Sequence, residues 1–305
     1  MNRNLFFSVV VPTYNRAHLI PKTIDSILAQ RYEPFELIIV DDGSTDDTEK
    51  VLQKYSTDPR FRYFRKENAE RGAARNYGFQ KAKGDYVFFI DSDDLMLPGH
   101  FSVMNEKIAR LGMLPDFVAP GFEIVNPDGS FNYPGHPFKE GWYDMNIILK
   151  GNYFACLVTV RRDNPDLIPY TEDRSLAVME DWIFLAQNLE KSRIYVLDQK
   201  TIHMVEHDQR SMADNMSVIK KRERATKYIM EKVTLNASQT RILKDFSNYF
   251  CAIHSTIEGK KGLAFSYLSK SYRSIPFKKS VSLTLKLLVG KRIFKWVKRL
   301  VKGSS

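Results

Sequence analysis

Three carboxylates stand within four residues directly after an apolar run, where Asp91, Asp93 and Asp94 follow residues 87–90. A run of this kind is typical of a strand that is buried on both faces. Carboxylates this close repel one another, which raises a pKa or requires a cation. A turn or a helix cap accounts for one aspartate but not for three. Mg²⁺ and Mn²⁺ bind carboxylate oxygens and usually complete their shells with phosphates, so the cluster predicts a divalent metal site that handles phosphates.

Polar residues also follow two earlier apolar runs. Pro12, Thr13 and Tyr14 end the first run, and Asp41 and Asp42 end the second. Two aspartates after a strand can accept hydrogen bonds from the N–H or hydroxyl groups of a ligand, and the glycine behind them allows the backbone to approach it closely. A strand-to-helix turn for the first group, and an Asx-turn with a helix cap for the second, explain the same residues without a ligand.

Two charged pairs stand at the starts of predicted helices. Arg71 and Arg75 lie four residues apart and share a helix face, and two cations beside a helix N-terminus suit a phosphate. Glu180 and Asp181 open a later helix and are followed by Trp182. A partly desolvated aspartate in that position is suited to act as a base. The alternatives are a solvated face for the arginines and a first turn stabilised by the helix dipole for the acids.

Alternating strands and helices must position these residues. The apolar runs predict strands over residues 5–11, 35–40, 61–65, 86–90 and 117–119, and helical spacing predicts helices over 18–30, 46–55, 71–82 and 99–110. This order implies a parallel sheet with helices on both faces, whose ligands bind outside the carboxyl ends of the strands. After residue 121 we predict a hairpin or surface loop over 126–144, strands over 156–160 and 194–197, a helix over 179–189, and mainly helices over 217–274.

The composition is that of a globular chain with a sizeable core, because 43% of its 305 residues are hydrophobic and 12% are aromatic. Two cysteines, Cys156 and Cys251, are too few for a disulfide framework and indicate a reducing compartment. No apolar stretch reaches about 18 residues, so we expect no transmembrane helix. The first apolar run stops at a proline, so we expect no signal peptide.

The net charge of +10 belongs to the C-terminal tail. Nine lysines or arginines and no acidic residue fall within 277–305, which leaves +1 for the rest of the chain. A nucleic-acid binder would need basic residues across its body, so we expect no nucleic-acid partner. From Lys291 to Lys302 the basic residues alternate at helical spacing with an apolar face that contains Trp296. This pattern predicts a basic amphipathic helix on an anionic membrane surface or, alternatively, a terminal helix packed on the domain.

The order of the motifs resembles that of the family 2 glycosyltransferases, a large inverting group with the GT-A fold. The resemblance is carried by VVPTYNR, LIIVDDGSTDDT, NAERGAARNYG, YVFFIDSDD and MEDWIF, which together span residues 5–189. Each motif alone is weakly specific, whereas five in this order are strongly specific. The resemblance implies an α/β fold of the GT-A (Rossmann-like) type, with a mostly parallel sheet flanked by helices and a C-terminal helical extension. We expect the chain to divide into residues 1–215, 216–274 and 275–305.

The resemblance also implies a set of residues that bind the nucleotide-sugar donor. Tyr14 would stack on the base, beside Pro12 and Thr13. Asp42, with Asp41, would bind the edge of a uracil-type ring, and Arg75 would contact the base or a phosphate. Asp91 and Ser92 would face the ribose or the sugar. Asp93 would bind the metal, expected to be Mn²⁺ or Mg²⁺. His207, which Ser211 follows four residues later, would approach the diphosphate or the metal, although a structural histidine is equally expected.

On the acceptor side, the resemblance implies that Asp181 is the catalytic base and that Glu180 and Trp182 position the acceptor. One departure from the family pattern lies upstream. Glu70 occupies the position where the family commonly has the glycine of an N-x-G motif. The local path of that loop therefore does not follow from the resemblance.

We therefore expect a metal-dependent inverting glycosyltransferase acting at the cytoplasmic face of a membrane in surface polysaccharide or glycolipid assembly. Its donor would be a nucleoside diphosphate sugar, UDP-linked in the commonest case, and its acceptor a saccharide or a lipid-linked sugar. One alternative is a phosphatase resembling the haloacid dehalogenases, which leaves the VDDGSTDD and MEDW motifs unexplained. Another is a non-catalytic nucleotide-sugar-binding or membrane scaffold protein, against which the intact Asp93 and Asp181 argue.

Overall fold

The chain folds into two compact units in a computed structural model that describes residues 4–206, 214–271, 273–285 and 287. The first unit comprises Met1–Ile148 with Asn152–Arg210, and the second comprises Leu149–Gly151 with Ser211–Ser305. The division at residues 215 and 274 that the sequence suggested stays a prediction. His207 and the basic segment from Lys291 to Lys302 lie outside the described residues.

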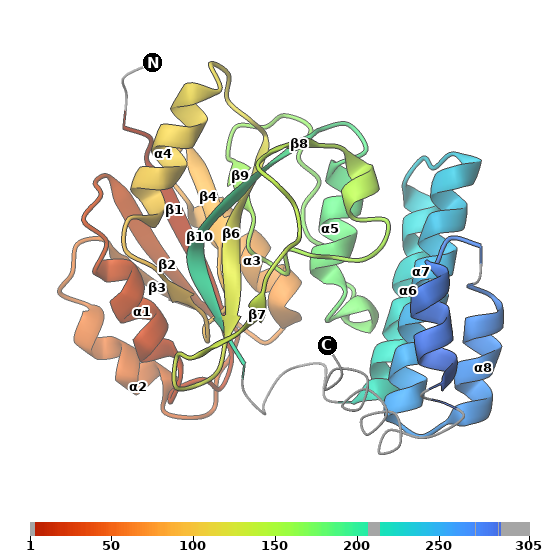
Figure 1. The fold of residues 1–305 in the computed structure, drawn as a ribbon. Coiled ribbons are helices and arrows are strands. Elements are labelled where there is room, and N and C mark those ends of the chain that lie inside the picture. Colours follow the sequence, from red (N-terminus) through yellow and green to blue (C-terminus); the bar gives the residue numbers. More distant parts are fainter. Residues whose placement is uncertain (1–3, 207–213, 272, 286, 288–305) are drawn as a thin grey trace, which may run out of the picture. The chain divides into compact units, whose positions relative to one another are not determined.

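A single twisted sheet forms the centre of the first unit (Figure 1). Its strand order is β3 (Phe61–Arg65), β2 (Phe35–Asp41), β1 (Phe7–Thr13), β4 (Tyr86–Phe89), β9 (Thr159–Arg161), β6 (Phe117–Val125), β10 (Ile194–Val205) and β5 (Leu95–Met96). Two short strands, β7 (Phe131–Pro134) and β8 (Gly141–Tyr143), pair with β6 and β10. The sheet is parallel from β3 to β4, and β9 then runs antiparallel to both β4 and β6.

The reversal at β9 decides where the strands end. Because β9 is antiparallel to both of its neighbours, β6 points the same way as β4, and β10 is parallel to β6. The carboxyl ends of β1, β2, β4, β6 and β10 therefore lie along one edge of the sheet. This is the edge where ligands bind in open α/β sheets. The predicted GT-A class is confirmed, with a parallel first half and a mixed second half.

Helices cover both faces of this sheet, which explains why its strands are continuously apolar. One face packs α1 (Ile20–Leu28) and α4 (His100–Arg110) against alternate residues such as Val9 and Ile39. The other face packs α3 (Glu70–Lys81) against Val10, and Phe184 of α5 (Glu180–Asn188) against Phe117. A short α2 (Thr48–Leu52), followed by one 3₁₀ turn, joins β2 to β3.

The predicted elements are present, but the strand predicted over 156–160 begins only at Thr159, and two strands are longer than predicted. β6 continues to Val125 and β10 to Val205, whereas the sequence suggested ends at residues 119 and 197. Pro120 and Gly121 suggested the end of a strand. In the fold they lie within β6, close to the point where its register with β10 shifts between Val196 and Lys200. Beyond β6 the predicted hairpin is present, since the amide of Asn126 donates to the carbonyl of Ser130 at 2.9 Å.

The second unit is helical, as the pattern over residues 217–274 predicted. It contains α6 (Asn215–Lys232), α7 (Ala237–Ile257) and α8 (Lys261–Ser269). Asn236 caps α7 through a reciprocal capping box with Gln239. A small core joins α7 and α8 to the helical turns that follow, through Ala252, Ala264, Leu268, Leu283 and Leu287. Among the described residues, no helix combines the length and apolar character needed to cross a bilayer.

The contact between α3 and the sheet yields a stability prediction. A methyl group at Gly78 would lie 2.3 Å from Cγ1 of Val10 and 3.2 Å from Cγ2 of Val40. We expect Gly78→Ala to lower the free energy of unfolding by about 1–3 kcal/mol, measured by urea denaturation. Gly262→Ala in α8 is the matched control, because outside the backbone of its own helix no described atom lies within 4 Å of the added methyl group. That variant should be neutral or gain about 0.5–1 kcal/mol. Wild-type stability in Gly78→Ala would contradict the described packing.

Candidate active site

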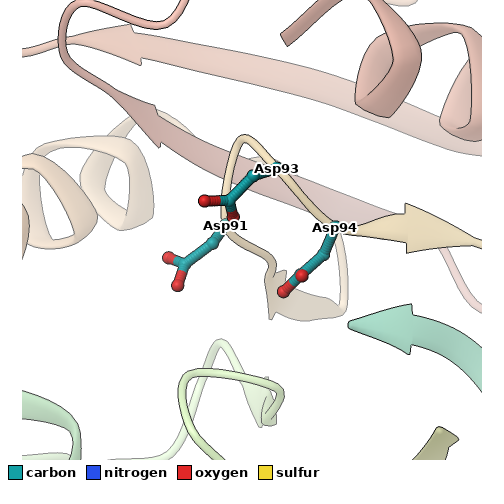
Figure 2. A group of neighbouring side chains, drawn as sticks. All are labelled: Asp91, Asp93 and Asp94. Atoms are coloured by element: carbon teal, nitrogen blue, oxygen red, sulfur yellow. The ribbon is translucent and has the colours of Figure 1, made fainter. Parts of the chain in front are cut away.

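The acidic loop after β4 brings three carboxylates together (Figure 2). One oxygen each from Asp91, Asp93 and Asp94 lies within 4.8 Å of the others. The loop is held in place because the amide of Asp94 donates to the carbonyl of Asp91 at 3.2 Å, and Oδ1 of Asp94 accepts from the amide of Val205 at 3.1 Å. Three converging hard oxygen donors fit Mn²⁺ or Mg²⁺.

Arg75 lies at the centre of a second cluster. Its side chain is completely buried, and its guanidinium contacts carboxylates from two distant segments. Nη2 donates to Oδ1 of Asp91 at 2.8 Å, while Nη1 donates to Oε1 of Glu180 at 3.1 Å and lies 2.8 Å from Oδ1 of Asp181. Arg71, one turn earlier on α3, places Nε 3.3 Å from Oε1 of Glu180. Two neighbouring positions on α3 thus connect the acidic loop to the start of α5.

This cluster holds two arginines against three carboxylates, so it carries one excess negative charge. Burial pushes the pKa of Asp91 and of Glu180 upward, but Arg71 and Arg75 outweigh burial and hold both pKa values below their usual range. Asp181 differs, because burial, together with the charges of Glu180 and Asp91, raises its pKa to about 7.

The short distance between Arg75 and Asp181 would by itself lower that pKa. The two atoms, however, are not aligned as a hydrogen bond, and Arg75 shares its charge with two other carboxylates. Burial therefore outweighs the attraction of Arg75, and the pKa of Asp181 lies above its usual range. A buried carboxylate with a pKa near neutrality is suited to accept a proton.

The ends of β1 and β2 form a third group. The amide of Asp42 donates to the carbonyl of Thr13 at 2.8 Å, which joins the two strand ends. Pro12 and Thr13 are buried, whereas Tyr14 is 46% exposed. The exposed ring of Tyr14 is thus available to a ligand, and Thr13 fixes the strand end beside it.

The two aspartates after β2 have different partners. Asp41 uses both oxygens within the fold, since Oδ1 accepts from the amide of Ser44 at 2.7 Å and Oδ2 from the hydroxyl of Tyr63 at 2.9 Å. Asp42 uses Oδ1 for Nζ of Lys66 at 2.8 Å and for the amide of Ala69 at 3.0 Å. Its Oδ2 accepts no hydrogen bond from any described residue. Asp42 therefore has one oxygen without a partner among the described residues, whereas both oxygens of Asp41 already accept hydrogen bonds within the fold. The predicted contacts of both residues with a ligand stay predictions.

Two further predicted residues have buried side chains. Trp182 is 2% exposed and donates Nε1–H to the carbonyl of Ile148 at 2.8 Å, so its ring packs in the core. This position argues against the predicted acceptor contact. Ser92 is also buried, between the two outer aspartates of the acidic loop. For His207, which the structure does not describe, the predicted role stays a prediction.

Several residues at the site were not predicted from the sequence. The thiol of Cys156 is buried beside the Arg75 cluster, and burial, with Asp91 nearby, raises its pKa well above the usual range. Tyr170 is buried with its ring under the guanidinium of Arg75, 5.4 Å from ring centroid to guanidinium carbon. The side chain of Asn15 accepts from the amide of Thr45 at 2.8 Å and holds the loop after β2. Cys156 and Tyr170 stand outside the quoted motifs, and Asn15 lies within VVPTYNR but no role was predicted for it.

Glu70, where the sequence departs from the expected motif, has a φ of +72°. This is the left-handed region that glycine enters without strain. The loop therefore keeps a backbone conformation suited to glycine although the side chain is glutamate. The departure in sequence has not removed the left-handed turn.

The family model described as "Glycosyl transferase family 2" matches residues 8–170, more than half of the chain. The chain belongs to this family. The matched range contains the ends of β1, β2 and β4, and it stops just before the segment that carries Glu180 and Asp181. Family membership removes the support for the phosphatase alternative.

A curated relative of this family 2 glycosyltransferase is the GalNAc(5)-diNAcBac-PP-undecaprenol beta-1,3-glucosyltransferase of Campylobacter jejuni, 41% identical over 103 residues. That match covers 33% of this chain and 33% of the relative. Two uncharacterized glycosyltransferases of Rickettsia bellii and Rickettsia felis, 36% and 47% identical, are matched over 23% and 22% of their own length. The chain thus spans less than a quarter of the length of these two relatives and a third of the Campylobacter protein.

Two solved structures share the fold. TarS of S. aureus, residues 1–349 in complex with UDP-GlcNAc, aligns with a TM-score of 0.66 at 20% identity and covers 96% of this chain and 91% of that one. The mannosyltransferase PcManGT of Pyrobaculum calidifontis, in complex with GDP-Man and Mn²⁺, aligns with a TM-score of 0.60 at 16% identity, covering 97% of this chain and 84% of that one. At this identity the two structures support the fold class.

The raised pKa of Asp181 predicts a pH-dependent effect of Asp181→Asn on stability. An unfolded aspartate titrates near 3.9, so the folded wild type binds this proton more tightly and loses stability as the pH rises from about 4 to about 7. Asparagine has no such proton to lose. We expect the Tm of Asp181→Asn relative to wild type to be higher at pH 8 than at pH 5, measured in EDTA by scanning calorimetry.

The exposed Asp166 provides a control, since its only described ion pair is a 4.0 Å contact with Lys191. Asp166→Asn should show nearly the same Tm difference from wild type at both pH values. An equal difference at pH 5 and pH 8 for Asp181→Asn would mean that the pKa of Asp181 is not raised.

Proposed function

We propose that this family 2 glycosyltransferase transfers a sugar from a nucleoside diphosphate sugar to an acceptor hydroxyl, with inversion at the anomeric carbon. The first donors to test are the UDP-linked sugars, which are the commonest. The observation that carries the proposal is the position of Arg75. Its guanidinium lies 2.8 Å from an oxygen of Asp91 in the acidic loop and 2.8 Å from an oxygen of Asp181. The buried guanidinium of Arg75 thus holds two carboxylates close together. Asp91 is placed to contact the donor, and Asp181 is placed to act as the base.

On the donor side, Tyr14 stacks on the base, and Asp42 accepts a hydrogen bond from the base through its remaining oxygen. Asp91 faces the ribose or the sugar while Arg75 holds its other side. Asp93 holds a divalent ion, Mn²⁺ or Mg²⁺, with Asp91 and Asp94 beside it. When bound, this ion supplies positive charge that offsets the charge of the leaving diphosphate.

On the acceptor side, Asp181 accepts the proton of the attacking hydroxyl. Its pKa near 7 suits this role, because a base with a pKa near the working pH is both deprotonated and basic enough. Glu180, 3% exposed and paired with both arginines, positions the start of α5. Attack from the face opposite the leaving group inverts the configuration, so a single base is sufficient.

The names of the related proteins support a donor and acceptor class. Two solved structures with this fold hold a nucleoside diphosphate sugar, and the curated relative from Campylobacter is named for a lipid-diphosphate-linked acceptor. We infer a saccharide or lipid-linked acceptor, and a place in polysaccharide or glycolipid assembly.

Titration calorimetry with a panel of UDP-, GDP- and TDP-linked sugars in Mn²⁺, paired with a transfer assay, tests this proposal. We expect one donor to bind only when Mn²⁺ is present. Asp181→Asn should keep donor binding and lose about 10²-fold or more in transfer. Asp93→Ala should lose metal-dependent binding, and Asp166→Asn should behave as wild type.

Two outcomes would contradict the proposal. If no sugar nucleotide binds, the donor site is wrong. If a donor binds but wild type and Asp181→Asn transfer equally little to every acceptor tested, the non-catalytic scaffold alternative is favoured.

We also propose that the second unit contacts an anionic membrane surface on the cytoplasmic side. Phe277, Val281 and Leu285 recur every fourth residue on a helical segment and are 81%, 37% and 45% exposed. Lys278 and Lys279 stand beside them, and no acidic residue follows. An exposed apolar stripe flanked by lysines suits an anionic lipid surface. The predicted basic helix further along would extend this surface.

Co-sedimentation with vesicles tests the membrane contact. We expect binding to phosphatidylserine-containing vesicles that weakens with salt, little binding to neutral vesicles, and a several-fold loss in the double variant Phe277→Glu, Val281→Glu. Phe131→Glu, at an aromatic residue of β7 that is 59% exposed, is the matched control. Equal binding by the double variant and wild type would exclude this stripe, and a concentration-dependent dimer lost in the double variant would indicate a second copy as its partner.

A further inference from the structure

The chain between β9 and α5 runs along α3 and touches it closely. A methyl group at Gly72 would lie 2.4 Å from the carbonyl oxygen of Thr171, so the backbone of this segment lies directly against the helix. No larger residue fits at that position without displacing the backbone of the neighbouring segment. Gly72 therefore serves the close approach of residues 170–172 to α3.

Asn76, one helical turn after Gly72, fastens the same segment. Its Nδ2 donates to the carbonyl of Tyr170 at 2.9 Å, and its Oδ1 accepts from the amide of Tyr170 at 2.9 Å. Nδ2 also donates to Oε1 of Glu172 at 2.8 Å. A carboxamide can donate and accept at once, and here it binds both polar groups of one residue's backbone as a paired strand would. Asn76 thereby fixes Tyr170 in position and orientation.

The ring of Tyr170 is fixed as well. It stacks on Phe184 with centroids 4.0 Å apart and planes at 6°, and it meets Phe89 edge-on at 5.3 Å and 83°. The guanidinium of Arg75 lies over this ring, 5.4 Å from its centroid. An aromatic face attracts a guanidinium, and more strongly when both are removed from water.

Arg75 needs such support. Its side chain is completely buried, its Nε finds no hydrogen-bond partner among the described residues, and its other nitrogens face three carboxylates. Hydrogen bonds alone therefore leave part of the guanidinium unsupported. The ring of Tyr170 supplies a flat surface that limits where the guanidinium can lie.

We propose that Tyr170 and Asn76 are positioning residues for glycosyl transfer. Asn76 holds the segment, the segment holds the ring of Tyr170, and the ring holds Arg75 in the orientation that aligns Asp91 with Asp181. This inference rests on the proposed function for what is aligned, but the contacts themselves do not depend on it. Since a displacement of about 1 Å costs about 10²-fold in rate, a loosened Arg75 reduces kcat before it unfolds the protein.

A series at residue 170 tests this inference against a role in packing alone. Tyr170→Phe keeps the aromatic face, so kcat should stay within about twofold of wild type. Tyr170→Leu removes that face, so kcat should fall about 10- to 100-fold with a smaller change in the KM of the donor. Phe117→Leu is the matched control, because it removes a buried ring that no described contact joins to Tyr170 or to Arg75. Asn76→Ala should lower kcat as Tyr170→Leu does.

Two kinetic results would overturn the inference. One is an equal loss of kcat in Phe117→Leu and Tyr170→Leu at equal Tm, which would assign the effect to packing. The other is a loss in Tyr170→Phe as large as that in Tyr170→Leu, which would assign it to the hydroxyl group.

A measurement without substrate separates this inference from the proposed function. In protein labelled with ¹⁵N-arginine, the Nε–Hε signal of Arg75, assigned with Arg75→Lys, should show a ring-current shift in wild type and in Tyr170→Phe. The shift should be lost in Tyr170→Leu. If no donor is ever transferred but these shifts are found, the proposed function fails while the support of Arg75 by Tyr170 stands. If the signal is the same in all three proteins, the positioning role is wrong.

Discussion

The site depends on the buried guanidinium of Arg75. Its contacts come from segments far apart in the sequence, with Asp91 after β4, and Glu180 and Asp181 at the start of α5. Burying a cation is unfavourable unless carboxylates lie against it, and burying carboxylates is unfavourable without a cation. Neither set would be stable in this position alone. Because the carboxylates exceed the arginines by one charge, one acid is held less firmly. It is Asp181, since Arg75 donates hydrogen bonds to Asp91 and Glu180 but not to Asp181.

The reversed strand β9 makes this meeting of segments possible. Since β9 is antiparallel to β4, it begins at the edge where β4 ends, which brings the preceding Cys156 close to Asp91. It also ends at the opposite edge, where the amide of Arg162 donates to the carbonyl of Asp85. The chain must then return along the sheet to reach α5. It does so beside α3, with Tyr170 at Asn76 and Thr171 at Gly72, and arrives at Glu180 next to Arg75.

The residues at the strand ends were predictable, because an apolar run that stops at charged residues reveals both the strand and the edge that binds ligands. The acidic loop and Asp42 were found in this way, whereas Arg75 and the Glu180–Asp181 pair were found from their places at the starts of predicted helices. Arg75 was expected to face a base or a phosphate, however, and no local pattern indicates that its partners are Asp91 and Asp181. Tyr170 and Cys156 were not found, since their importance arises from tertiary contacts. The burial of Trp182 was not predicted either, because adjacency to Asp181 in sequence says nothing about the direction of a side chain on a helix.

The two close-packed glycines of α3 limit how its sequence can change over evolution. Gly78 is pressed against Val10 of the sheet, and Gly72 against the backbone of Thr171. Each glycine in a helix interior lowers stability by roughly 0.5–1 kcal/mol relative to alanine. Alanine would therefore stabilise the helix itself, but its methyl group would clash with the neighbouring segment. Relatives that keep this arrangement should vary at the exposed Gln80 long before they vary at either glycine. A substitution at Gly72 would require compensating changes in the neighbouring residues 170–172. We therefore expect the sequence of this helix to diverge slowly at its two glycines, while other parts of the fold vary more freely.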